Sequence, residues 1–255
     1  MRFFTGSSDH SGAVSVNVPN QAVLEAQINQ RWADGQGFAL ATLNLDHLVK
    51  LRRDPAFLAA YDAQDMVVAD GNPVVWLSRL AGDPVELVPG ADIVVRLAEL
   101  AQAAGVSVAL VGSTDNSLKC AAEALCQRVP GLEIAALIAP PMGFDPAGTA
   151  ADEVFSRLQN SGARLCLVAL GAPKQEIFSA RGRAKTPQIG FASIGAGLDF
   201  LAGHQARAPR WVRAIAMEWL WRLLSDPRRM AMRYLLCFAI LPGHMLRAMI
   251  HRNNS

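Results

Sequence analysis

The stretch Met66-Val67-Val68-Ala69-Asp70-Gly71-Asn72-Pro73 decides how the chain folds. Its apolar run is typical of a buried strand, and the run ends on a carboxylate. Glycine then turns the chain, and Pro73 suits the first turn of a helix because its missing N–H is not needed there. In an α/β chain this order places Asp70 at the carboxyl end of a strand, where such folds bind ligands. Two interpretations stay open: a ligand-facing carboxylate, or a turn residue with Asn72 as the cap of the next helix.

Strand-like and helix-like segments alternate on both sides of this stretch. Short apolar runs predict strands, and segments with apolar residues at helical spacing predict the helices between them. Strands that alternate with helices favour a Rossmann-like α/β fold, in which helices cover both faces of a mostly parallel sheet. Residues 1–18 show no clear period, which predicts a loose arm or a short edge hairpin. The expected strands are 38–43, 66–69, 106–112, 132–138, 164–170 and 188–194.

The composition fits a well-packed soluble protein. The chain has 255 residues, of which 51% are hydrophobic, so it is long enough for one large domain or for a domain with an appendage. Its four cysteines lie in apolar segments and form no C-x-x-C pair, which predicts reduced core thiols of a cytosolic protein. The first residues lack the basic, apolar and small-residue regions of a secretion signal.

Charge divides the chain into two parts. Residues 205–255 contain nine arginines and two carboxylates, whereas the rest has 15 basic and 20 acidic residues. We therefore expect a Rossmann-like domain over 1–204 and a basic helical appendage over 205–255 with an anionic partner. The apolar run Tyr234–Leu241 ends at Pro242, well short of the about 20 residues that a spanning helix needs. The appendage is therefore expected to dock on a membrane surface; the alternative is a helix packed on the body or in an interface between copies.

Three predicted strands end in small residues where a helix begins. These turns are at Gly112, Gly171 and Gly195. Glycine lets a ligand approach the backbone and helix N-termini attract phosphate, so the turns favour a crevice for a nucleotide or sugar nucleotide. The dinucleotide fingerprint is absent because Phe200 stands where its third glycine belongs, and there is no Walker A run. Since the chain also lacks a D-x-D pair and histidines at metal-ligand spacing, we expect no metal ion and no other cofactor.

Several motifs follow one another in a specific order. Over residues 37–236 they resemble the WecG/TagA/CpsF glycosyltransferases, N-acetylmannosaminyl transferases and their relatives in bacterial surface-polysaccharide assembly. The motifs are Thr42-x-Asn44-x-Asp46-His47, Ala69-Asp70-Gly71, Pro141-x-Gly143-Phe144, Gly171-Ala-Pro-Lys-Gln-Glu176, Leu198-Asp-Phe-Leu-Ala-Gly203 with Arg207-Ala-Pro-Arg-Trp211, Glu218-Trp-Leu-Trp-Arg222, Asp226-Pro-Arg-Arg229 and Arg233-Tyr234.

This resemblance implies a metal-independent, inverting transfer from a UDP-sugar to a polyprenyl-diphosphate-linked saccharide. The implied place is the cytoplasmic side of the bacterial inner membrane, on its surface. The implied donor is UDP-N-acetylmannosamine or its uronic acid, with UDP-glucose and UDP-glucuronate as alternatives. By resemblance, Asp70 is the catalytic base, Thr42 and Asn44 belong to the catalytic site, and Gln175 binds substrate. Helix capping is the alternative role for Asn44, and Asp199 is expected to hold its loop by a hydrogen bond.

An inverting transfer also needs positive charge near the departing diphosphate. Without a metal ion, arginines and helix N-termini must supply that charge. Arg207, Arg210 and Arg213 are candidates, with a solvated face as the alternative. The resemblance breaks at Leu87, where the family often has an arginine, and we expect Arg79 or an arginine of the appendage to replace it.

The residue pattern supports a ligand role for Gln175 as well. It stands near the third position of a helix whose cap, Ala172, has no side-chain oxygen, so no capping box engages the Gln175 amide. The alternative is an ordinary surface residue. Two other function classes stay open, a Rossmann-type nucleotide-dependent oxidoreductase and a non-catalytic membrane-binding module. A homo-oligomer is also left open, and nucleic acid is not an expected partner.

Overall fold

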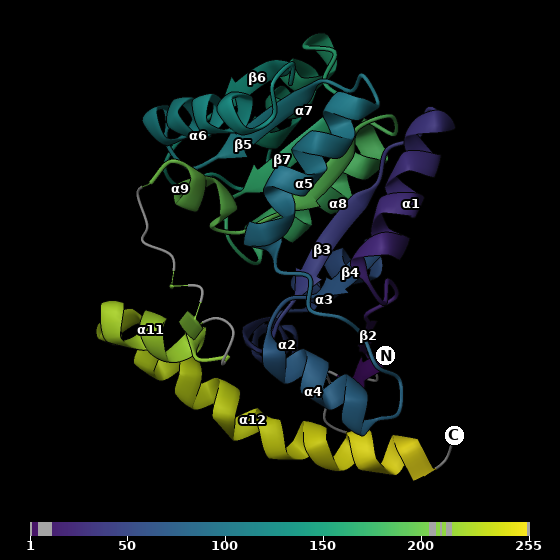
Figure 1. Cartoon of the computed structure of the whole chain (residues 1–255), viewed down its shortest axis with the longest axis vertical. Helices are drawn as coiled ribbons and strands as arrows, with labels where there is room; N and C mark the ends of the chain where they lie inside the picture. The colour runs from purple at the N-terminus through teal and green to yellow at the C-terminus, as the bar shows by residue number, and fades with distance from the viewer. Residues whose placement is uncertain (1, 5–11, 204–207, 210, 213–215, 254–255) are drawn as a thin grey trace.

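A six-stranded parallel sheet forms the centre of the computed structural model, which describes residues 2–4, 12–203, 208–209, 211–212 and 216–253 (Figure 1). The strand order is β4-β3-β8-β7-β5-β6, and each neighbouring pair runs in the same direction. All six predicted strands are present; β4 has the predicted bounds, and the other five are one to three residues shorter than predicted. Their bounds are β3 (Ala39–Leu43), β4 (Met66–Ala69), β5 (Val108–Gly112), β6 (Ile134–Ile138), β7 (Leu165–Ala169) and β8 (Gly190–Ser193).

Helices cover both faces of this sheet, which confirms the Rossmann-like α/β prediction. Alternate residues of β5 show the division, because Val108 and Leu110 pack with α1, α5 and α6, whereas Ala109 and Val111 pack with α7 and α8. The helices of the body are α1 (Gln21–Ala33), α2 (Leu45–Leu51), α3 (Pro55–Asp62), α4 (Asn72–Leu80), α5 (Gly90–Ala103), α6 (Asp115–Arg128), α7 (Thr149–Asn160), α8 (Lys174–Lys185) and α9 (Gly197–Leu201).

Helix caps explain where several of these helices begin. The side chains of Asn44 and Thr114 accept the backbone N–H three residues on, at 3.0 and 3.2 Å. The capping interpretation of Asn72 is wrong, because Asn72 is already the first residue of α4 and Gly71 precedes it. Gly71 has φ +124°, a conformation that side chains other than glycine rarely adopt. This glycine therefore fixes the direction in which the chain leaves Asp70.

The N-terminal segment forms a hairpin outside the main sheet. Strands β1 (Arg2–Phe4) and β2 (Ala13–Ser15) pair antiparallel, which agrees with the predicted short hairpin. Phe3 and Val14 are buried in an apolar cluster that also contains residues of α2, α3 and α4. Cys237, from near the C-terminal end of the chain, belongs to the same cluster.

Two helices, α11 (Glu218–Ser225) and α12 (Pro227–Asn253), follow the body; we call them the appendage helices. In Figure 1, α12 lies across the lower side of the body, where it packs on α2 and α4. The helix continues through Pro242, where the sequence predicts an interruption. Met230–Asn253 is consequently long and apolar enough to cross a membrane by length and composition. One side of it nevertheless packs on the body, where Met230, Cys237, His244 and Ala248 are buried.

Candidate functional site

The carboxyl ends of neighbouring strands bring the predicted site residues together. Strands β8, β7 and β5 are adjacent, so the turns at Gly195, Gly171 and Gly112 share one edge of the sheet, as predicted. On the other side of β8, Asn44 follows β3 and Asp70 follows β4. Because parallel strands point the same way, all these groups face the edge where α/β folds bind ligands.

Asp70 is held at this edge by both backbone and side-chain contacts. Its backbone N–H donates to the Leu43 carbonyl at 2.7 Å, which extends the β3–β4 pairing by one residue. The Thr42 hydroxyl and the Gly90 backbone N–H donate hydrogen bonds to its carboxylate. Burial raises the pKa of Asp70 to about 6, and these two hydrogen bonds oppose the increase. Since the residue keeps part of its surface accessible, Asp70 combines a raised proton affinity with contact to solvent.

Gly90 places a helix N-terminus against this carboxylate. It is the first residue of α5, so its N–H has no partner within the helix and is free to bind Asp70. A Cβ on Gly90 would lie 3.2 Å from the Ile194 carbonyl oxygen, which is tight, so the glycine lets α5 approach the end of β8. The sequence analysis did not identify Gly90; the Val88-Pro89-Gly90 turn directly before a helix is the signal that could have found it.

Thr42 and Asn44 are both next to Asp70, in different roles. Thr42 is buried and its hydroxyl faces the Asp70 carboxylate. Asn44 caps α2 through its side-chain oxygen, and its Cβ lies 3.8 Å from where a Cβ on Gly71 would be. The capping role that the sequence left open for Asn44 is therefore present, beside the partly accessible end of β3.

The appendage helices reach this site through α11. The guanidinium of Arg222 lowers the pKa of Asp70 and the carboxylate of Glu218 raises it, so both charges act on Asp70. Arg222 Nε donates to Glu218 at 3.0 Å, one turn earlier on α11. The Arg222 guanidinium also lies 5.7 Å from the ring centroid of Phe200 on α9. Sequence analysis matched Glu218 and Arg222 to the family motif but did not name them as site residues.

Gln175 is buried, and its amide already has protein partners. Its Nε2 donates to Glu176 Oε1 at 2.8 Å, and its Oε1 accepts the Gly195 backbone N–H at 3.1 Å. The expectation of an amide left available to a ligand therefore needs correction. The predicted absence of a capping box is confirmed, although the cap is Pro173 and not Ala172. The buried amide instead fixes the turn after β8.

Glu176 is a second carboxylate with a raised pKa. Burial raises its pKa to about 7, and the hydrogen bond from Gln175 opposes this increase. Its side chain is fully buried, and its Oε2 has no hydrogen-bond partner. This burial could not be predicted locally, because a glutamate in the first turn of a helix is usually a solvated residue.

A buried His–Tyr pair supports the segment behind Thr42. His47 Nδ1 lies 2.7 Å from the Tyr61 hydroxyl, which in turn donates to the Thr42 carbonyl oxygen at 3.2 Å. Burial lowers the pKa of His47 to about 3, so the ring is neutral at physiological pH. Its role is to hold the end of β3 in position.

The structure places only some of the predicted glycines and arginines near the site. Gly112 has φ +120°, and a Cβ there would lie 2.2 Å from the Ala169 carbonyl oxygen, so this glycine is required by strand packing. Gly171 has φ +72° and open space around its missing Cβ. Arg79 is exposed in the last turn of α4, whereas Asp70 precedes the first, so the structure does not bring the two together. Arg207, Arg210 and Arg213 lie outside the described residues.

Two further residues at the strand ends agree with or extend the sequence analysis. Asp199 accepts a hydrogen bond from Ser113 Oγ at 2.7 Å, as expected for a residue that holds its loop. Leu87 is exposed and its backbone bridges to Ala69, so the position where the resemblance lacks an arginine lies beside Asp70. Within the described part of the chain, no three His, Cys, Asp or Glu side chains form a group that could hold a metal ion.

The model of the Glycosyl transferase WecG/TagA/CpsF family matches residues 12–255, nearly the whole chain. The chain belongs to this family. Membership in the WecG/TagA/CpsF family makes the protein a glycosyltransferase of cell-surface polysaccharide synthesis, and it implies a sugar-nucleotide donor and a lipid-linked acceptor.

Proposed function

We propose that the protein transfers a sugar with inversion from a UDP-sugar to a polyprenyl-diphosphate-linked saccharide, with Asp70 as the general base. The observation that carries this is the position of the Asp70 carboxylate. It is oriented by Thr42 and Gly90, it keeps part of its surface accessible, and the charge of Arg222 reaches it from α11. A base with a pKa of about 6 is ionised at neutral pH and still binds a proton well.

The body then supplies the general base, and the appendage helices supply the cation that stabilises the leaving group. Asp70 takes the proton of the acceptor hydroxyl as its oxygen forms a bond to the anomeric carbon of the donor. The bond between that carbon and the diphosphate breaks, and UDP leaves with the electron pair. Arg222 is placed to stabilise the diphosphate charge, a role that the sequence analysis assigned to an arginine of the appendage or to Arg79. The exposed Leu87 beside Asp70 cannot contribute charge.

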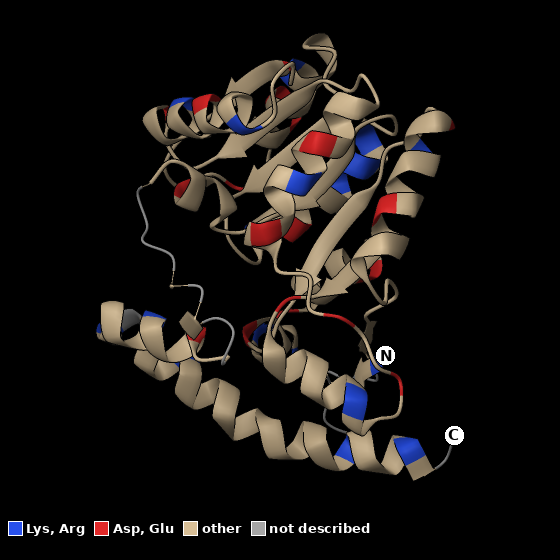
Figure 2. Ribbon diagram, viewed as in Figure 1, with Lys and Arg blue, Asp and Glu red and all other residues tan. Residues whose placement is uncertain are grey.

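The outer side of α12 supports a position on the membrane surface. Tyr234–Leu246 contains no charged residue, and most of the length of α12 is uncharged in Figure 2. An apolar helix side with arginines near its ends fits binding at the interface of an anionic membrane. Its exposed large apolar residues are Met232, Leu235, Phe238, Met245, Leu246, Met249 and Ile250.

Turnover with purified substrates tests the reaction. We expect transfer from UDP-N-acetylmannosamine, or from one of the other three UDP-sugars named above, to a lipid-linked acceptor, with full rate in excess chelator and an inverted anomeric configuration by NMR. Loss of rate in chelator that a divalent cation restores would refute the metal-independent mechanism. Retention of configuration would refute direct displacement.

Sedimentation with anionic vesicles tests the membrane position. We expect Leu246→Ser/Ile250→Ser to lose vesicle binding while its thermal unfolding is unchanged, because both side chains are exposed. Met142→Ser, on a fully exposed loop residue of the body, is the matched control. Equal sedimentation of all three proteins would exclude α12 as the docking element.

A further inference from the structure

One buried carboxylate pairs with two cations where α2 meets α12. Asp46 Oδ2 lies 3.0 Å from Lys50 Nζ, one turn along α2, and 3.1 Å from a guanidinium nitrogen of Arg233 on α12. The Asp46 side chain is 10% exposed and that of Arg233 is 36% exposed, so solvent screens this pair less than a surface ion pair. The cluster joins the body to the appendage helices.

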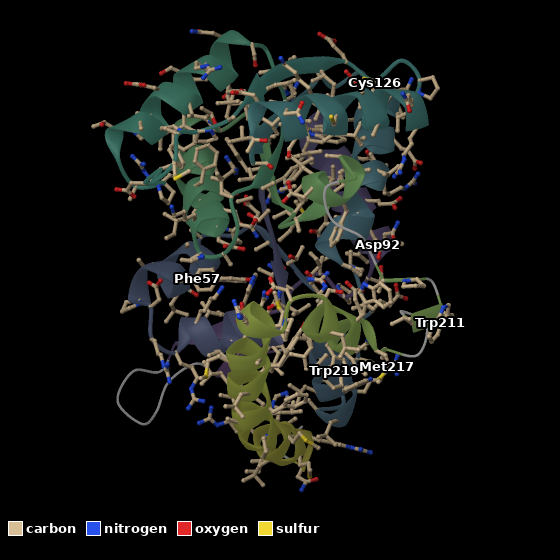
Figure 3. The ribbon with its side chains drawn as sticks, turned by 90° about the vertical axis from the view of Figure 1, so that its left-hand side faces the viewer. Phe57, Asp92, Cys126, Trp211, Met217 and Trp219 are labelled. Atoms are coloured by element: carbon tan, nitrogen blue, oxygen red, sulfur yellow. The ribbon has the colours of Figure 1, made fainter. Side chains whose placement is uncertain are left out.

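Arg233 is placed where α12 also holds α11. Its neighbour Tyr234 packs edge-on against Trp219 of α11, with ring centroids 6.0 Å apart. Trp219 makes a second edge contact with Phe238, at 5.6 Å, and Figure 3 shows this tryptophan where α11 and α12 meet. These rings hold α11 on the part of α12 that carries Arg233. The ion pair that anchors Arg233 to the body therefore also positions α11.

The same ion pair is close to the site on the body side. Asp46 follows Thr42 by four residues, and the Thr42 hydroxyl binds the Asp70 carboxylate. On the appendage side, α11 carries Arg222, whose charge acts on Asp70. The Asp46–Arg233 ion pair therefore connects the segment that contains Thr42 to α12, on which α11 with Arg222 packs.

We propose that Asp46 is a positioning residue that holds the appendage helices in place through Arg233, so that Arg222 faces Asp70. It contacts no substrate and acts through Arg222. The part of this proposal that concerns catalysis rests on the proposed function, in which Arg222 stabilises the leaving diphosphate. The part that concerns docking of α12 stands on the ion pair itself.

Because Lys50 also pairs with Asp46, substitution of Asp46 and substitution of Arg233 should affect docking of α12 to different extents. Asp46→Asn removes the attraction and leaves Lys50 and Arg233 near one another as like charges. Arg233→Gln removes the attraction but keeps the Asp46–Lys50 pair. The double variant Asp46→Asn/Arg233→Gln removes the repulsion as well. We therefore expect Asp46→Asn to loosen α12 most, with the double variant closer to Arg233→Gln.

Alkylation of Cys237 measures docking of α12 directly. This thiol is one turn beyond Arg233 and is 6% exposed against the body, whereas Cys166 in β7 is fully buried in the core. We expect iodoacetamide, followed by peptide mapping, to modify Cys237 about tenfold faster in Asp46→Asn and about threefold faster in Arg233→Gln. Cys166 should stay protected in both variants, which separates loosening of α12 from unfolding.

The two variants act oppositely on the chemistry of this thiol, which removes an ambiguity. The charge of Asp46 raises the pKa of Cys237 and that of Arg233 lowers it. Arg233→Gln alone would therefore slow alkylation of a docked thiol, because the thiolate is the reactive form. Faster alkylation in Arg233→Gln consequently means release of α12, and unchanged or slower alkylation would overturn the docking part of the proposal.

Binding of UDP, measured by calorimetry, tests the link to Arg222. We expect Arg222→Gln to weaken UDP binding about tenfold and Asp46→Asn to weaken it somewhat less. In the Arg222→Gln background, Asp46→Asn should change the UDP affinity less than about twofold, since both act through one interaction. Asp62→Asn and Arg128→Gln, exposed residues of the body with the same charge changes, are the controls and should bind like the parent.

The outcomes separate this proposal from the proposed function. Additive effects of Asp46→Asn and Arg222→Gln on UDP binding would overturn the positioning role, whatever the alkylation rates. A parent protein that binds no UDP would refute the proposed function and the link to Arg222, while faster alkylation of Cys237 in Arg233→Gln would still establish the anchor at Asp46.

Discussion

Asp70 and Glu176 are two carboxylates whose pKa values burial raises, to about 6 and to about 7, at neighbouring parts of one sheet edge. Asp70 keeps accessible surface and receives hydrogen bonds from Thr42 and Gly90. Glu176 is fully buried, with one oxygen bonded to Gln175 and the other without a partner. The comparison teaches that a raised pKa reports burial, whereas accessibility decides which carboxylate can take a proton from a substrate.

Substitution of each carboxylate by its amide should give the largest difference between Asp70 and Glu176. We expect Asp70→Asn to lower kcat by about 10²–10⁴-fold, because the base is lost, while UDP still binds. Glu176→Gln should keep kcat within about tenfold of the parent, because this side chain does not reach the substrate. Radiolabelled transfer and calorimetry with UDP measure the two effects. Equal losses in the two variants, or full turnover by Asp70→Asn, would refute the assignment of the base.

The pH dependence of kcat/KM shows whether ionisation of Asp70 or of Glu176 controls the rate. Because the base must be ionised, we expect kcat/KM to fall below pH about 6, by about tenfold for each further pH unit. Asp70 supplies this break, so it should persist in Glu176→Gln. A break near pH 7 that disappears in Glu176→Gln would instead place the rate-controlling ionisation at Glu176.

Removal of one hydrogen bond to Asp70 should shift that break by a smaller amount. The Thr42 hydroxyl favours the ionised carboxylate, so Thr42→Val should raise the pKa of Asp70 and move the break upward by roughly 0.5–1 pH unit. Thr42→Ser keeps the hydroxyl and is the matched control. If the pH profiles of the two variants coincide, the hydroxyl does not act on the base.

The smallest effect concerns stability. Glu176 binds its proton more tightly in the folded chain, with a pKa of about 7 against the ordinary 4.5, so it costs stability increasingly as pH rises through that interval. Glu176→Gln removes this dependence. The melting temperature of the variant minus that of the parent should therefore increase by about 2 °C or more from pH 4.5 to pH 7.5. A constant difference over this range would mean that Glu176 is ionised at little cost.

The sheet and its flanking helices could be predicted from the sequence because each element carries a local signal. Runs such as Val108–Gly112 specify buried parallel strands, and polar caps such as Asn44 and Thr114 specify where helices begin. The turn at Gly71 could also be predicted, since a glycine between a strand and a proline-containing helix marks a turn. These features depend on residues close together in the chain.

The contacts that complete the site could not be predicted because they join distant segments. Gly90 donates to Asp70 only once α5 has packed against β8, and the Gln175 oxygen is engaged only because folding brings the Gly195 N–H to it. Arg222 lies 152 positions beyond Asp70 in the sequence. Its motif was visible, but local periodicity does not say which surface a following helix covers. The continuation of α12 through Pro242 was missed because a single proline was taken as an end point.

The contact between Phe3 of β1 and His244 of α12, with ring centroids 6.3 Å apart, has a consequence for how the protein is made. Phe3 is synthesised more than two hundred residues before its partner His244. The α2, α3 and α4 helices can cover most of the hairpin early, but the part of Phe3 that faces His244 stays uncovered until α12 has been made. A chaperone that shields the nascent hairpin would act before α12 emerges, and its release would coincide with docking of α12 on β1.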